Sequence, residues 1–181
     1  LSAPAVVGGR VTVPGIGTDS LQGDARFVEI LEQMGCEVAV EADRMTVSHK
    51  AETSLRAVDV DLGAMPDVAP TLAVLALFAD GVTTIRNVPN LRIKETDRLA
   101  ALKAELIKLG ASVEELPDGL RITPPNRLTP VAIETYNDHR MAMSFSLAGL
   151  RCPGLIINDA ECSAKTFPGF FDRFDALIRS A

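Results

Sequence analysis

The sequence predicts an α+β domain in which buried helices lie inside and sheets lie outside. Three observations predict it: apolar residues make up 47% of the 181 residues, the chain contains a weak internal repeat, and two helical stretches are apolar on almost every side. A chain of this length can bury one substantial core. Helices without a polar face are buried, so the sheets must cover them from outside, in an inside-out arrangement.

The repeat relates residues 27–47 to residues 102–122. In each stretch an amphipathic helix ends at a glycine, and two short strands follow around a polar turn. The apolar spacing matches at most positions, but Glu105 falls where the first stretch has Ile30. The repeat therefore predicts two related units.

Each unit is predicted to contain a strand, an amphipathic helix, two strands, a further strand and a buried helix, an arrangement of the βαβαββ type. The first unit spans about residues 10–81 and the second about residues 82–153. We expect the buried helices to begin at Asp67 and Asp138, because aspartate is a favoured N-cap residue.

A third unit, at about residues 154–181, starts with a strand at 155–157 and continues into a helix at about 166–178. Its later strands and its buried helix are missing, so this unit is incomplete. No linker divides the chain, and we expect residues 1–181 to form a single domain. The first residue is Leu1 rather than Met, and we interpret the chain as part of a longer protein.

The composition argues against several classes of protein. The net charge of −6 and the 4% of aromatic residues disfavour a nucleic-acid surface, which needs a basic face and stacking platforms. No apolar run reaches the roughly 18 residues of a membrane span. The sequence contains no CxxC pair, which predicts a reduced, intracellular protein; the three cysteines are Cys36, Cys152 and Cys162.

Two clusters of charged residues precede predicted helices. Lys94 and Arg98 lie at a helix start, where the positive end of the helix already favours phosphate or carboxylate. The alternative is a solvated helix start that is capped by Asp97. Arg140 lies in the first turn of a buried helix, where an arginine needs an anionic partner. That partner is either a bound anion or Asp138.

Three further residues have one structural and one functional interpretation. Asp67 is either only a helix cap or a partly desolvated carboxylate that acts as a general base. Lys165 is either a surface lysine or another anion-binding cation at a helix start. His139 is either a structural residue or a direct catalyst.

Helix starts in related units converge on one face, so the sequence predicts that these charges meet. An acidic protein has little structural reason to gather cations, whereas a doubly anionic substrate requires them. The predicted cations are Lys94, Arg98, Arg140 and Lys165, and the acids beside them are Asp67 and Glu95.

The motifs that contain these residues resemble those of the EPSP synthase family. The resemblance covers essentially the whole chain, as the C-terminal part of a longer protein. The matching motifs are Ser20–Asp24, Pro66–Asp67, Arg92–Arg98, Tyr136–Met143 and Ala164–Pro168.

The resemblance implies a two-domain, EPSP synthase-like fold in which this chain is the phosphoenolpyruvate-binding domain. It implies transfer of the enolpyruvyl group from phosphoenolpyruvate to the 5-hydroxyl of shikimate 3-phosphate, with release of phosphate. No metal and no organic cofactor are expected. The implied partners are the two substrates and an N-terminal domain of the same enzyme, which is expected to be a monomer in the bacterial cytoplasm or a plant plastid. We expect the chain alone to be inactive.

The resemblance also implies a role for each site residue. Asp67 is implied as the base for the attacking hydroxyl, and Glu95 as a proton-transfer partner. The others are implied as phosphoenolpyruvate ligands (Arg98, Arg140, Lys165), as contacts of shikimate 3-phosphate (Asp67, Asn90, Lys94) and as supporting residues (Asp97, Asp138, His139).

Two alternatives remain. UDP-N-acetylglucosamine enolpyruvyl transferase shares the fold but commonly uses a loop cysteine from the other part of the enzyme, and none of the three cysteines here lies in such a motif. A non-catalytic domain that only binds anions or a partner is the second alternative. The presence of Asp67 and Glu95 counts against a role in binding alone.

Overall fold

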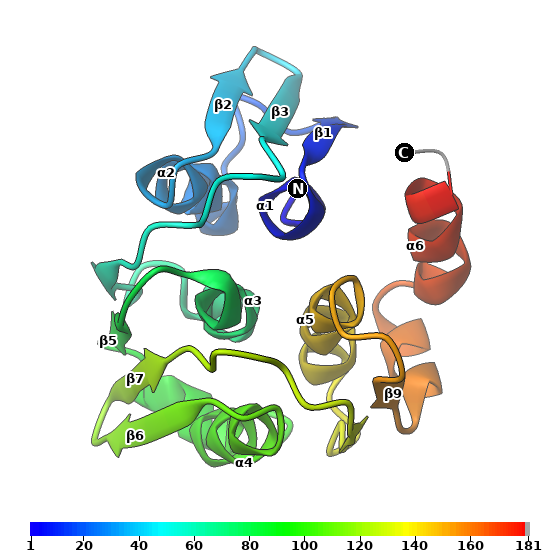
Figure 1. The fold of residues 1–181 in the computed structure, drawn as a ribbon. Coiled ribbons are helices and arrows are strands. Elements are labelled where there is room, and N and C mark those ends of the chain that lie inside the picture. The colour runs from blue at the N-terminus through cyan, green and yellow to red at the C-terminus, as the bar shows by residue number, and fades with distance from the viewer. Residues whose placement is uncertain (180–181) are drawn as a thin grey trace.

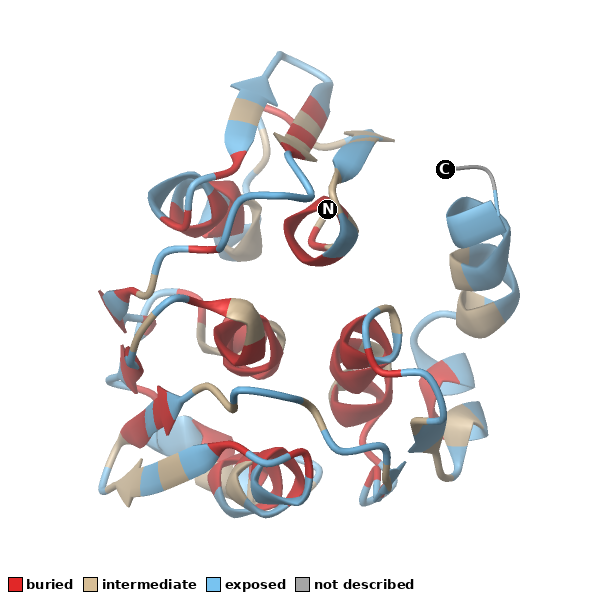
Figure 2. Ribbon diagram, in the orientation of Figure 1, coloured by how far each residue is buried: buried red, intermediate tan, exposed pale blue. Residues whose placement is uncertain are grey.

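The computed structural model describes residues 1–179, and Figure 1 shows its three central helices nearly end-on. These helices are α1 (Ala3–Val7), α3 (Ala69–Leu75) and α5 (His139–Gly149). Figure 2 shows that α3 and α5 are largely buried, as their apolar surfaces predict. The predicted α+β fold with helices inside is therefore confirmed. Within residues 1–179, none of the helices has the length and apolar character needed to cross a membrane.

The first two units contain the same elements in the same order. In the first unit α3 follows β1 (Gly9–Pro14), α2 (Phe27–Gln33), β2 (Glu37–Val40), β3 (Arg44–His49) and β4 (Asp59–Asp61). In the second unit α5 follows β5 (Thr83–Arg86), α4 (Arg98–Lys108), β6 (Ser112–Leu116), β7 (Gly119–Thr123) and β8 (Ala132–Ile133). This repetition supports the proposed division into units.

Neighbouring units share sheets. The first sheet has the strand order β1-β3-β2, with antiparallel pairs. The second has the order β4-β5-β7-β6, in which β4 of the first unit pairs in parallel with β5 of the second, placing Val60 opposite Ile85. The same parallel link joins β8 to β9 (Ile156–Ile157), with Ile133 opposite Ile157. The last strand of each unit thus lies beside the first strand of the next one.

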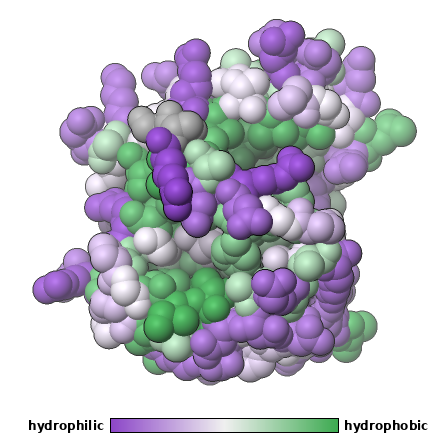
Figure 3. Space-filling model, turned by 90° about the vertical axis from the view of Figure 1, so that its right-hand side faces the viewer, coloured by the Kyte–Doolittle hydropathy of each residue, from purple (hydrophilic) through white to green (hydrophobic). Residues whose placement is uncertain are grey.

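The third unit continues from β9 through the 3₁₀ helix η5 (Ala160–Lys165) into α6 (Phe170–Arg179). The predicted helix start near residue 166 is wrong, because Gly169 adopts a left-handed φ of 72° just before α6. None of the α6 residues within 170–179 is buried. Figure 3 views the molecule from the side on which α6 lies in Figure 1, and green apolar patches lie between purple polar ones there. Leu177 and Ile178 of α6 are 40% and 43% exposed.

Aspartates cap two of the helices that lead into the polar site. Asp138 caps α5 by accepting a hydrogen bond from the Arg140 N–H, and Asp97 caps α4 by accepting one from the Ala100 N–H. The prediction that Asp67 caps α3 is wrong. A 3₁₀ turn, η2 (Pro66–Val68), precedes α3 and contains Asp67. Because the Asp67 carboxylate does not cap α3, it is available to the cations of the site described below.

Candidate active site

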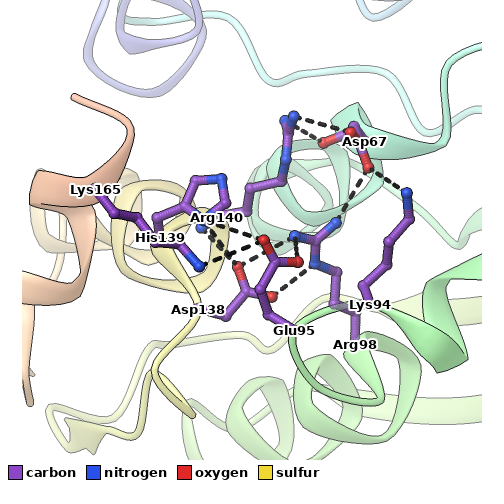
Figure 4. A network of polar contacts seen from close by, with 8 residues as sticks. All are labelled: Asp67, Lys94, Glu95, Arg98, Asp138, His139, Arg140 and Lys165. Carbon is purple, nitrogen blue, oxygen red and sulfur yellow. Dashed lines mark hydrogen bonds and ion pairs between the residues drawn. The ribbon is translucent and has the colours of Figure 1, made fainter.

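Arg98 lies at the centre of a network of eight charged or titratable side chains (Figure 4). Its side chain is only 1% exposed, and its Nε donates to Asp138 Oδ2 at 2.7 Å. Its Nη2 donates to Asp138 Oδ1 at 3.3 Å and to Glu95 Oε2 at 2.7 Å, and its Nη1 donates to Asp67 Oδ1 at 3.1 Å. These bonds use four of the five N–H donors of a guanidinium group. Arg98 thus joins three acids from separate segments.

Asp67 is the acid that lies among three cations. Arg140 Nη2 donates to Asp67 Oδ2 at 2.9 Å, and Arg140 Nη1 donates to the backbone carbonyl of Asp67 at 3.0 Å. Lys94 Nζ lies 3.6 Å from Asp67 Oδ1, the oxygen that also accepts from Arg98. The side chains of Asp67, Lys94 and Arg140 are each about a third exposed, so solvent and small ligands reach them.

Glu95 is the second partly exposed acid. Lys165 Nζ donates to Glu95 Oε1 at 3.5 Å, and His139 Nδ1 lies 3.6 Å from the same oxygen. Lys165 ends η5 in the third unit, whereas Asp67 lies in the first unit and Glu95 in the second. The network therefore combines side chains from all three units.

Asp138 is fully buried and ionised. Burial opposes the charge, but hydrogen bonds from Arg98 and from the Arg140 N–H outweigh it and keep the pKa of Asp138 below its ordinary value. Removing either partner of such a buried pair leaves an uncompensated charge. Asp138 thus fixes the orientation of Arg98 and the start of α5.

The remaining titratable groups differ in their protonation. A hydrogen bond to its own backbone N–H and the nearby Arg98 keep the pKa of Glu95 below its ordinary value, despite partial burial. Burial lowers the pKa of His139 and outweighs the attraction of Asp138 and Glu95. The Nδ1 atom of His139 is buried and has no hydrogen-bond partner among residues 1–179. At neutral pH the site therefore holds an ionised Glu95 beside a neutral His139.

The structure brings together all four predicted cations and both predicted acids, as Figure 4 shows. Arg98 differs from the expectation of a freely presented ligand, because it is buried and largely occupied by carboxylates. Lys94, Arg140 and Lys165 are the exposed cations, at 33%, 30% and 47%. Direct contact of Arg98 with a substrate stays a prediction.

Two predicted site residues lie outside the network of Figure 4. Asn90 is exposed in η4 (Pro89–Ile93), the 3₁₀ helix that precedes α4. Asp97 has a structural role as the cap of α4, and it also accepts a hydrogen bond from Arg92. In residues 1–179, no three His, Cys, Asp or Glu side chains gather in a way that could hold a metal ion.

A pocket of about 360 Å³ adjoins the network. Asp67 and Arg140 line it together with Phe170, Phe174 and Leu177 of α6. The Thr71 and Ser144 hydroxyls, 3.2 Å apart, join α3 to α5 along its wall. The polar network therefore opens onto a partly apolar cavity.

Two supporting residues were missed from the sequence. Glu105 is fully buried on α4 and accepts a hydrogen bond from the Tyr136 hydroxyl, in the segment that leads to Asp138. The signal for Glu105 was present, because an acid interrupts the apolar repeat there. Tyr136 begins one of the matching motifs, but nothing in the sequence indicated its left-handed conformation, with a φ of 56°, which is unusual for a tyrosine.

The fold of this chain is that of the enolpyruvyl transferase class. It is similar to EPSP synthase from Acinetobacter baumannii (TM-score 0.82, 28% identity), covering 97% of this chain and 43% of that one. It is also similar to the enolpyruvyl transferase NikO from Streptomyces tendae (TM-score 0.72, 26% identity), covering 98% and 40%. The family model described as EPSP synthase (3-phosphoshikimate 1-carboxyvinyltransferase) matches residues 1–174, and the chain belongs to this family.

Curated relatives agree with this assignment. The chain is 55% identical over 177 residues to "3-phosphoshikimate 1-carboxyvinyltransferase 2" of Nicotiana tabacum, covering 95% of this chain and 52% of the relative. It is 50% identical over 177 residues to the 3-phosphoshikimate 1-carboxyvinyltransferase of Shewanella halifaxensis, covering 98% and 41%. The chain thus spans about half, or less, of the length of these relatives.

Proposed function

We propose that this chain is the phosphoenolpyruvate-binding domain of an enzyme that transfers the enolpyruvyl group to the 5-hydroxyl of shikimate 3-phosphate. One observation carries the proposal: four cations from three separate segments surround two partly exposed acids (Figure 4). Counting Lys94, Arg98, Arg140 and Lys165 against Asp67, Glu95 and Asp138, with a neutral His139, the network has a net charge of +1. In a protein of net charge −6, this local excess favours small anions.

The cations are proposed to serve two substrate positions. Arg140 and Lys165, supported by Arg98, are proposed to bind the carboxylate and phosphate of phosphoenolpyruvate. Lys94, Asp67 and Asn90 are proposed to contact shikimate 3-phosphate. Because Asp67 and Glu95 now occupy the cations, substrate anions compete with them.

The proposed reaction is an addition followed by an elimination. Asp67 takes the proton of the 5-hydroxyl as the hydroxyl oxygen bonds to C2 of phosphoenolpyruvate, while C3 gains a proton from Glu95. In the elimination C3 returns a proton to Glu95 and the C2–O bond to phosphate breaks, which restores the double bond. The leaving phosphate takes up the proton that Asp67 accepted from the hydroxyl. Glu95 is ionised beside Arg98 and Lys165; a phosphate bound beside it raises its proton affinity, which equips it to hold the proton.

The complete enzyme is proposed to include a second domain that supplies the remaining substrate contacts. The relatives' greater length supports this, and closure of two domains would exclude water from the site. The chain alone is therefore proposed to bind phosphoenolpyruvate weakly and to lack turnover. A monomer is proposed for the complete enzyme, in the bacterial cytoplasm or in a plastid.

Calorimetric titration of the chain with phosphoenolpyruvate tests the binding proposal. Arg140→Met or Lys165→Met is expected to weaken binding about tenfold or more, the cost of losing a charge-assisted hydrogen bond. Arg44→Met is the matched control, because Arg44 pairs with exposed acids of the β2–β3 turn. Equal effects of all three substitutions would contradict the proposal.

A phosphate-release assay tests the catalytic proposal. The chain alone is expected to show no turnover, and turnover is expected when the N-terminal portion of a relative is added. Asp67→Ala in that mixture is expected to abolish turnover while phosphoenolpyruvate still binds. Unchanged turnover would favour a non-catalytic, anion-binding domain, and turnover with UDP-N-acetylglucosamine instead of shikimate 3-phosphate would favour the cell-wall transferase.

A further inference from the structure

Glu105 is a fully buried acid at the position where the first unit has an apolar residue. It is 0% exposed on α4, and its counterpart Ile30 on α2 is 3% exposed. Burying a carboxylate is costly unless hydrogen bonds and an opposite charge compensate it. Since isoleucine fills this position in the first unit, packing alone does not explain an acid in the second.

Three groups compensate the buried carboxylate. Lys108 Nζ donates to both oxygens at 2.8 Å and balances the charge. The backbone N–H of Glu134 donates to Oε2 at 3.1 Å, and the Tyr136 hydroxyl donates to Oε1 at 2.8 Å. Burial and the hydrogen bond to Glu105 raise the pKa of Tyr136 to about 12, so its hydroxyl keeps the proton that it donates.

The segment that Glu105 holds is a strained turn. Tyr136 and Asn137 have φ values of 56° and 55°, a left-handed conformation that asparagine tolerates but that is uncommon for a tyrosine. The turn ends at Asp138, which caps α5 and pairs with Arg98. Such a conformation persists only where surrounding contacts hold it.

Both contacts of α4 with this turn come from one face of the helix. Arg98 and Glu105 are seven residues apart, which is two helical turns. Arg98 donates a hydrogen bond to the turn at Asp138, and Glu105 accepts hydrogen bonds from the turn at Glu134 and Tyr136. The two left-handed residues, Tyr136 and Asn137, thus lie between the bond at Glu134 and the bond at Asp138.

We propose that Glu105 is a positioning residue for the anion site. Through Glu134 and Tyr136 it holds the turn that presents Asp138, His139 and Arg140. The inference rests on the proposed function only for the identity of the bound anion. Without these hydrogen bonds the turn relaxes, and Arg140 loses its fixed place beside Asp67.

The two histidines of the chain allow a test without substrate. His139 directly follows the turn and lies among Asp138, Glu95, Lys165 and Arg140, whereas His49 lies in β3 of the first unit. Both are titrated by NMR in the chain and in the variants Tyr136→Phe and Glu105→Gln. We expect the pKa of His139 to rise toward its ordinary value in both variants, because its burial decreases, while that of His49 stays constant.

The matched control is Ile30→Val, which alters the equivalent position of the first unit. It is expected to leave the pKa of both histidines unchanged, even if the substitution lowers the stability of the chain slightly. An unchanged His139 in both variants, or equal shifts of His49 and His139, would overturn the inference.

Phosphoenolpyruvate titration of the same proteins provides a second measurement. Tyr136→Phe is expected to weaken binding about three- to tenfold, which is the effect of one lost hydrogen bond. Failure of every protein to bind phosphoenolpyruvate would refute the proposed ligand, while the His139 titration would still decide the role of Glu105. Unweakened binding by both variants would overturn the positioning role.

Discussion

Arg98 and Asp138 are forty residues apart in the sequence and form an ion pair of 2.7 Å whose side chains are 1% and 0% exposed. Each opens one helix: α4 starts at Arg98, and Asp138 caps α5. The pair therefore joins the start of α4 to the start of α5 and is buried within the network that contains the more exposed cations Lys94, Arg140 and Lys165.

Arg98→Met is expected to destabilise the fold strongly. The substitution leaves Asp138 buried without its partner, which typically costs about 3–5 kcal/mol in the free energy of unfolding. Arg121→Met is the matched control, because the Arg121–Glu114 pair is more than half exposed and such pairs contribute about 0–1 kcal/mol. Urea denaturation measures both, and similar losses in the two variants would contradict the importance of burial.

Acid is expected to destabilise the fold through Asp138. Its pKa is lower in the folded chain than the ordinary value of 3.8, so between the two values the unfolded chain binds more protons. The stabilisation is complete above the unfolded pKa and is lost as the pH falls through the folded pKa. Denaturation at pH 2–6 is expected to show a flatter pH dependence for Asp138→Asn. The exposed substitution Asp43→Asn should keep the original slope, and an unaltered slope in Asp138→Asn would refute the assignment.

The two exposed lysines are expected to affect different substrates. Lys94 lies beside Asp67, whereas Lys165 lies beside Glu95. In the mixture with the N-terminal portion of a relative, Lys165→Met is expected to raise the KM for phosphoenolpyruvate about tenfold, and Lys94→Met the KM for shikimate 3-phosphate. Steady-state kinetics with each substrate varied in turn measures this. Identical effects of both substitutions on one substrate would show that the two lysines do not serve separate substrate positions.

The cysteines are expected to resist thiol reagents in the folded chain. Cys36, Cys152 and Cys162 are all buried, and burial raises the pKa of Cys36 to about 11. Because the thiolate is the reactive form, almost none is present at pH 8. Labelling with a chromogenic disulfide is expected to be slow in buffer and to reach three thiols per chain in urea. Rapid labelling of Cys36 without denaturant would contradict its burial.

Much of this architecture could be predicted from the sequence, because it follows from local patterns. The apolar surfaces of the helices around Leu72 and Phe145 predicted burial, and the glycines after α2 and α4 marked the ends of those helices. The convergence of Lys94, Arg140 and Lys165 followed from the repetition of the units. These features depend on residues that are close in the sequence or on the internal repeat, and both can be recognised in a single sequence.

Other features depend on contacts between distant segments, which the sequence does not display. The 3₁₀ turn that frees Asp67 from capping α3 was missed, because an aspartate before an apolar run usually caps the helix. The burial of Arg98 was also missed, since its three acidic partners come from three segments. The break in the repeat at Glu105 was visible, but its partner Tyr136 lies on another segment.

The parallel links between β4 and β5 and between β8 and β9 have a consequence for folding. The first and second units each contribute their final strand to the sheet of the next unit. The β4-β5-β7-β6 sheet and the β8-β9 sheet are therefore complete only when two successive units are in place. Such interlocking makes unfolding cooperative across the chain rather than stepwise, unlike in stacked repeat proteins whose units touch only at their surfaces. A proteolytic cut between β4 and β5 would therefore break the chain between two strands of one sheet, β4 from the first unit and β5 from the second.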